Sequence, residues 1–274
     1  MNEQNAEFLK ERLFYLGFGD KLNAELEKNM KAGKEQFQLP FRGEFSKGEK
    51  KDVVDYQVDF SKSKQGDMYF VNKYQATLKN EDPEKEKSQT FYINKGNGVT
   101  AKEAYNMLDG RAVNKKLMDR EDNPYQAWLQ INFKEKDDNG HHKINRYHTA
   151  YGFDLEKSLG KLPIKELAGP EQKSSIMKGL EKGNLQPVTF QRDGKEEKMF
   201  LEANPKERNV IVYDSSMKKQ FQGVKEHKGD ATEMKEGSNQ EQSSIKQSAE
   251  KMNTEDESGA KEKKEKRRGR GVSA

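Results

Sequence analysis

Cysteine is absent from all 274 residues, and so is any long apolar run. Without cysteine the chain forms neither disulfides nor thiolate sites, which fits a reducing compartment. No stretch approaches the roughly 20 apolar residues that span a bilayer. The first residues, 1 to 7, also lack the basic region and apolar run of a secretion signal. We therefore expect a cytoplasmic protein with no membrane partner.

Apolar residues are scarce as well, because 31% of the chain is hydrophobic and 36% is charged. This balance predicts modest cores rather than a single large one. The first 67 residues nevertheless have clear periodicity. Apolar side chains recur at helical spacing up to Gly17 and again up to Gly33, at Leu9, Leu13, Leu16, Leu22, Leu26 and Met30. Residues 37–41 and 54–60 then alternate as strands, so residues 1–67 predict a helix-helix-hairpin unit.

Residues 68–153 predict a β-rich central segment with one helix. Residues 69–78 and 88–93 are rich in aromatic and β-branched side chains, as strands are. Thr100 and Glu103 have the spacing of a capping box, which predicts a helix over 101–108. Residues 125–134 and 144–151 predict a hairpin, and the pair Asn139-Gly140 between them favours a type I′ turn.

The order helix, helix, hairpin returns in residues 154–222. Leu155, Leu159 and Leu162 repeat the spacing of the first helix, and a second helix ends near Gly183, as its counterpart ends near Gly33. We infer a degenerate internal duplication. The predicted fold class is α+β, with antiparallel sheets, short helices, two related helix-helix-hairpin units around the central segment, and a disordered C-terminal tail.

That tail, residues 223–274, contains no aromatic residue, and this composition predicts disorder. Residues 261–270 carry seven basic and two acidic side chains, a net +5 against +4 for the whole chain, so the rest of the chain carries −1. Such a run contacts DNA or RNA phosphates without sequence preference, or it simply keeps the protein soluble. The basic residues are Lys261, Lys263, Lys264, Lys266, Arg267, Arg268 and Arg270.

No set of side chains predicts catalysis or metal binding. His141 and His142 are neighbours in sequence beside an expected turn, and neighbouring strand residues point to opposite faces, so with His148 they do not make a tidy ligand set. Lys95 to Gly98 lacks the glycine spacing of a phosphate-binding loop and fits a plain turn better. We expect no enzyme, no metal and no cofactor.

Tyr125, Trp128 and Tyr147 are a candidate aromatic surface in the central hairpin. Alternation assigns Ala127, Leu129, Ile131 and Phe133 to one face of the strand and Trp128 to the other. Five basic residues lie near in sequence, at positions 111, 115, 116, 120 and 146. Either nucleic-acid bases stack on these rings, or the rings pack between sheet and helices.

Two stretches carry a family resemblance. Leu26 to Lys34 with the strands after it, and Leu180 to Phe190 followed by Gly194 to Phe200, resemble the uncharacterised domain of unknown function 3945 of Bacteroidota, often encoded on conjugative or mobilisable elements. The resemblance covers about residues 20–75 and 170–215, and the central block departs from the pattern. It implies an accessory protein of a mobile element and supplies no catalytic residues.

The expected function is therefore a non-enzymatic binding or adaptor protein, accessory to a mobile genetic element, that contacts nucleic acid through its basic tail. The competing hypothesis is a protein-protein interaction or structural module with no nucleic-acid contact, in which hairpin edges recruit a partner strand.

Overall fold

A computed structural model describes residues 1–48, 50–93 and 98–220. Within these ranges the chain has five α-helices and three antiparallel sheets, which confirms the α+β prediction. The disorder predicted for residues 223–274 lies outside the described residues. Across the described ranges, the helices are all too short or too polar to cross a membrane.

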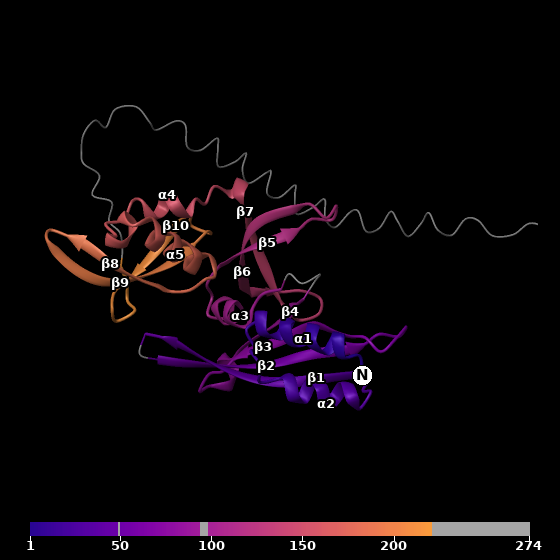
Figure 1. Cartoon of the computed structure of the whole chain (residues 1–274). Coiled ribbons are helices and arrows are strands. Elements are labelled where there is room, and N and C mark those ends of the chain that lie inside the picture. The colour runs from indigo at the N-terminus through magenta and orange to yellow at the C-terminus, as the bar shows by residue number, and fades with distance from the viewer. Residues whose placement is uncertain (49, 94–97, 221–274) are drawn as a thin grey trace, which may run out of the picture. The chain divides into compact units, whose positions relative to one another are not determined.

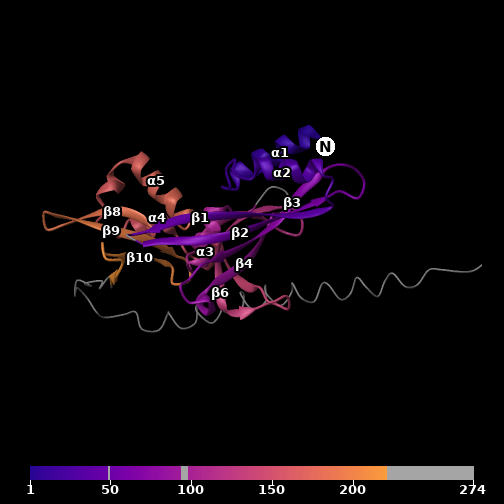
Figure 2. The same cartoon turned by 90° about the horizontal axis from the view of Figure 1, so that it is seen from below.

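The first unit is two helices followed by four strands that pair in sequence order, β1-β2-β3-β4. Figures 1 and 2 show the two helices on the same face of this sheet. The boundary expected after residue 67 lies between β2 and β3, which are neighbours in the sheet. The elements are α1 (Glu3–Tyr15), α2 (Asn23–Lys31), β1 (Gln36–Lys47), β2 (Lys50–Lys62), β3 (Tyr69–Leu78) and β4 (Lys87–Tyr92), with a 3-10 turn at Pro83–Lys85.

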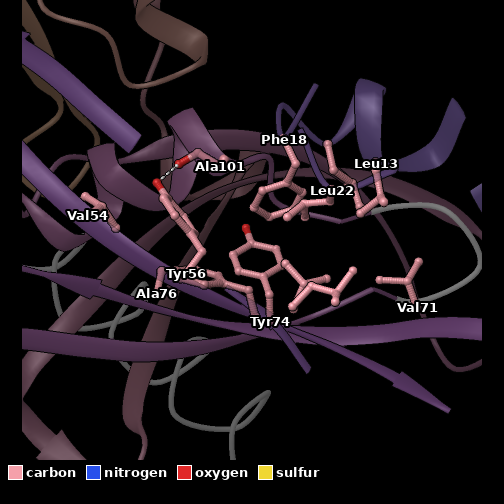
Figure 3. Packing of buried hydrophobic residues seen from close by; sticks show 14 of the residues in the cluster. Leu13, Phe18, Leu22, Val54, Tyr56, Val71, Tyr74, Ala76 and Ala101 are labelled. Carbon is pink, nitrogen blue, oxygen red and sulfur yellow. Dashed lines mark hydrogen bonds between the residues drawn. The ribbon is translucent and has the colours of Figure 1, made fainter. Parts of the chain in front are cut away.

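Aromatic and aliphatic side chains together fill the space between this sheet and its helices (Figure 3). The ring of Phe18, just after α1, meets those of Tyr56 and Tyr74 edge-on at 5.6 and 5.4 Å. Both tyrosines are fully buried, so their hydroxyls need partners. Tyr56 donates to the carbonyl of Ala101 at 2.7 Å and Tyr74 to that of Val99 at 2.5 Å. The core thus ties the sheet to the next helix.

That helix, α3 (Ala101–Leu108), begins with the predicted capping box, since Thr100 and Glu103 each bond the other's backbone N–H. A three-stranded sheet of order β5-β6-β7 follows. Its first strand, β5, was not predicted. The predicted hairpin is present, and the two strands that form it are β6 and β7. The bounds are β5 (Val113–Met118), β6 (Pro124–Lys136) and β7 (His142–His148).

The turn between β6 and β7 corrects one expectation. A type I′ turn needs positive φ at both central residues, but Gly140 has φ 80° and Asn139 is not left-handed. The carboxylate of Asp137 accepts N–H bonds from Asn139 and His141 at 3.0 and 2.9 Å, which selects a local Asx turn instead. The strand expected to run to Tyr151 ends at His148, and a 3-10 turn (Thr149–Tyr151) follows.

The second unit repeats the helix-helix-strand order of the first, and the internal duplication stays a prediction. Its strands also pair in sequence order, as β8-β9-β10-β11. Asp193 and Gly194 have φ 49° and 73° and make the expected tight turn between β8 and β9. The elements are α4 (Leu155–Leu159), a 3-10 turn (Lys165–Ala168), α5 (Pro170–Glu181), β8 (Gln186–Arg192), β9 (Lys195–Asn204), β10 (Asn209–Tyr213) and β11 (Lys219–Gln220).

Candidate functional site

The predicted aromatic surface is largely buried. Trp128 is 7% exposed and Tyr147 is 8% exposed, and both belong to the core of the second unit. The Trp128 ring packs edge-on against Phe153 at 5.3 Å. This corrects the expectation of an exposed surface. The physical reason is that β6 is covered on both faces, because Leu129 and Ile131 belong to the first core while Trp128 belongs to the second.

Tyr125 differs from the other two predicted aromatics. It is half-buried at the start of β6, and its ring stacks on that of His148, at the end of β7, with centroids 5.2 Å apart. The structure therefore separates Tyr125 from Trp128 and Tyr147 and pairs it with a histidine. Alternation along one strand could not reveal this pair, because it depends on how β6 and β7 are aligned.

The histidines do not converge. The backbone N–H and carbonyl of His142 bond the side chain of Gln89 on β4, at 3.0 and 3.1 Å, and burial lowers the pKa of the His142 imidazole. His141 has Asp137 3.8 Å away. Among the described residues no group of three or more His, Cys, Asp or Glu side chains could hold a metal ion. The turn at Lys95 to Gly98 and the basic run 261–270 lie largely or wholly outside the described residues.

In the described part of the chain, the outer face of α1 carries more exposed aromatic rings than any other element. Phe8, Phe14 and Tyr15 are 54, 64 and 69% exposed, while the opposite side of the helix buries Leu9 and Leu13 in the core. Helical periodicity places Phe8 and Tyr15 seven residues apart on one stripe, and Phe14 meets Tyr15 edge-on at 6.0 Å. The leucine spacing indicates the buried side of this helix, and the aromatics on its other side were not predicted as a site.

Carboxylates flank these rings. Glu3, Glu7 and Glu11 are all exposed on α1. Lys10 is drawn toward α2, since its ammonium lies 2.6 Å from Glu27 as well as from Glu7. The hydrogen bond from Lys10 lowers the pKa of the Glu27 carboxyl, which keeps this link ionised. The Arg12 guanidinium lies over the Phe8 ring, 5.5 Å from its centroid. The outer face of α1 is thus aromatic, with three exposed carboxylates and this one guanidinium.

A cluster of charged and polar side chains lies between the end of α3, the sheet of the first unit and the sheet of the second unit. Asp109 lies 2.7 Å from the Lys47 ammonium and 3.2 Å from Nη2 of the buried Arg111. The Glu202 carboxylate interacts electrostatically with these three residues and accepts a hydrogen bond from the Tyr213 hydroxyl at 2.8 Å. Burial raises the pKa of the Glu202 carboxyl. These residues come from β1, β9, β10 and the end of α3. Their contacts make a structural link, and their wide sequence separation gave no signal of it.

Comparison with protein-family models, curated proteins and solved structures finds no match for the chain. The resemblance to the domain of unknown function 3945 therefore stays a prediction.

Proposed function

We propose that the chain is a non-enzymatic adaptor whose folded part binds a partner protein on the outer face of α1. The observation that supports this is the group Phe8, Phe14 and Tyr15, each more than half exposed on a helix of 13 residues. Grouped exposed rings cost hydration free energy in an isolated protein and are typical of interaction surfaces. A partner that covers them gains the burial of three aromatic side chains.

The charge on this face defines the partner. Glu3, Glu7 and Glu11 are exposed on this helix and outnumber the Arg12 guanidinium that lies over Phe8. A segment that combines apolar and basic side chains therefore complements the surface best. An amphipathic helix with Leu on one side and Lys or Arg flanking it has this chemistry. An acidic segment would meet like charge, and a purely basic segment would leave the rings in water.

A synthetic 18-residue Leu/Lys amphipathic peptide tests this against its Leu/Glu counterpart, with calorimetry on the full chain. We expect the Leu/Lys peptide alone to bind, and Phe14→Gln with Tyr15→Gln to weaken it at least tenfold. Tyr92→Gln is the matched control, because Tyr92 is 55% exposed on β4. If the double variant Phe14→Gln, Tyr15→Gln bound the Leu/Lys peptide as tightly as the native chain does, the proposal would be contradicted. Self-association of the native chain that the same variant abolishes would assign the face to a second copy instead.

A second candidate function is nucleic-acid contact through residues 261–270. It is supported by the seven basic side chains in that run, and the mobile-element context is supported by the resemblance alone. Replacing all seven with Gln should abolish salt-sensitive binding to a random duplex. The slope of log affinity against log salt falls by about 0.9 for each phosphate contact removed, so an unchanged slope would contradict this role.

A further inference from the structure

An open groove of about 460 Å³ lies at the end of the three-stranded sheet, where β6 begins and β7 ends. Tyr125 lines it from β6, His148 from β7 and Lys116 from β5. The residues that line it differ from those on the outer face of α1. Its lining combines two rings, a cation and the backbone of the short turn after β7.

The two rings form a stack that the sheet itself fixes. Their planes are 24° apart with centroids 5.2 Å apart. Ala127 pairs with His148, so Tyr125, two residues before Ala127, lies diagonally across from His148 on the same face of the sheet. Tyr125 is half-buried and His148 is exposed. One ring is therefore anchored, and the other offers a face to a ligand.

Two cations lie near this stack, on the two strands that neighbour β6. Lys116 is exposed on β5 and lines the groove, but it pairs with Gln126 and so projects from the face opposite Tyr125. Arg146 is exposed on β7, on the same face as His148 and outside the groove lining. In the described part of the chain neither of them forms an ion pair. The turn that joins β5 to β6 carries Asp119, Glu121 and Asp122, and the Asp119 carboxylate accepts N–H bonds from Glu121 and Asn123 at 2.9 and 2.8 Å. A negative group in the groove thus meets Lys116, and a second one beyond the groove, on the face of His148, meets Arg146.

We propose that this groove binds single-stranded nucleic acid, with a base stacked on His148 and the flanking phosphates on Lys116 and Arg146. Bases of any identity have a π-face, and stacking on an aromatic pair beside cations is how sequence-tolerant single-strand sites work. A duplex hides its base faces, so it offers this groove only phosphates. The open shape suits one or two nucleotides of a longer strand, whose neighbouring phosphates reach the cations on separate strands of the sheet.

The test measures binding of fluorescein-labelled dT12, rU12 and a 12-base-pair duplex to the full chain by anisotropy. All proteins carry Gln at the seven basic positions of 261–270, so that the basic run contributes nothing. We expect dT12 or rU12 to bind more tightly than the duplex. Tyr125→Ala should weaken this binding about tenfold, while Tyr125→Phe, which keeps the stack, should not. Comparing the affinities for dT12 and rU12 distinguishes DNA from RNA as the ligand.

Two further variants separate stacking from folding. His148→Ala removes the exposed ring, where loss of stability is small, and should weaken binding as much as Tyr125→Ala does. Arg146→Gln should lower the salt slope and leave the preference for single strands intact. Tyr92→Ala, an exposed ring elsewhere, should bind normally. Binding that His148→Ala leaves unchanged, a preference for duplex, or no binding by the parent protein would each overturn the proposal, whatever the basic run does in the native chain.

Discussion

The two helix-sheet units end their second helix in the same way and then pack differently. In the first unit, the Gly33 N–H donates to the Met30 carbonyl and the Lys34 N–H to the Asn29 carbonyl. In the second unit, the Gly183 N–H donates to the Leu180 carbonyl and the Asn184 N–H to the Gly179 carbonyl. These are Schellman motifs with a left-handed glycine, φ 70° and 73°. All of these positions are displaced by the same 150 residues.

The surroundings of the two glycines differ. A Cβ on Gly33 would have no atom within 4 Å, whereas one on Gly183 would lie 2.8 Å from the carbonyl oxygen of Ala112 and 3.0 Å from Val113. Beside it, Asn106 donates from Nδ2 to the carbonyl of Lys182 at 2.6 Å. The same local motif lies open at the surface in the first unit. In the second unit it packs against α3 and the start of β5.

The largest expected difference in the free energy of unfolding is between the Gly183→Ala and Gly33→Ala variants. Both place a Cβ on a left-handed residue, which costs about 1 kcal/mol. Only Gly183→Ala also forces a backbone oxygen and Val113 apart, which costs about 2 kcal/mol more. Urea unfolding of the full chain should therefore show a loss of about 3 kcal/mol for Gly183→Ala and about 1 kcal/mol for Gly33→Ala. Equal losses would mean that the contact with Ala112 contributes nothing.

This comparison shows what sequence could and could not predict. Glycine after a helical repeat predicts the helix end at both Gly33 and Gly183, because that signal is local. The contact of Gly183 with Ala112 is not local, and neither is the burial of Trp128, which requires the second core to cover the back of β6. Strand β5 escaped prediction because two lysines interrupt its apolar pattern, a feature that an edge strand tolerates.

The candidate sites follow the same division. The basic character of residues 261–270 is a property of sequence alone. The pairing of Tyr125 with His148 depends on register, and the exposure of Phe14 and Tyr15 depends on which side of α1 meets the sheet. Leu9 and Leu13 predicted that buried side correctly, so the aromatic face could have been found by reading the residues left over on the same helix.

The second comparison concerns the buried rings of the two cores. Tyr56 and Tyr74 in the first core bond α3 and its cap through their hydroxyls, while Phe190 in the second core has no hydroxyl to pair. Tyr56→Phe should therefore cost about 1 kcal/mol at pH 7, measured by urea unfolding. Tyr92→Phe, at an exposed ring, is the control and should cost nothing measurable.

Alkaline pH sharpens this expectation. Burial raises the pKa of the Tyr56 and Tyr74 hydroxyls, so above pH about 10 the unfolded chain loses these protons while the folded chain keeps them. Native stability should fall as pH rises through that range, and the fall should be shallower in Tyr56→Phe. An identical slope in both proteins would show that Tyr56 ionises as easily in the folded chain as in the unfolded one.

The smallest expected effect compares two carboxylates, Asp55 on β2 and Glu202 on β9, which both alternate with buried core residues along their strands. Arg42 bonds Asp55 at 2.6 Å and lowers the pKa of its carboxyl, whereas burial raises the pKa of the Glu202 carboxyl. Stability from Asp55 is present at neutral pH and is lost as pH falls; stability from Glu202 is present in acid and is lost as pH rises.

Asp55→Asn should therefore destabilise the chain slightly at pH 7 and not at pH 3, because the exposed pair with Arg42 is weak and exists only while Asp55 is charged. Glu202→Gln should stabilise the chain at pH 7 and leave it unchanged at pH 3, since Gln keeps an acceptor for the Tyr213 hydroxyl without the buried charge. Thermal unfolding at the two pH values measures both. Shifts of the same sign at pH 7 would show that Arg111 and Lys47 outweigh burial at Glu202, and that this link is held by its charges.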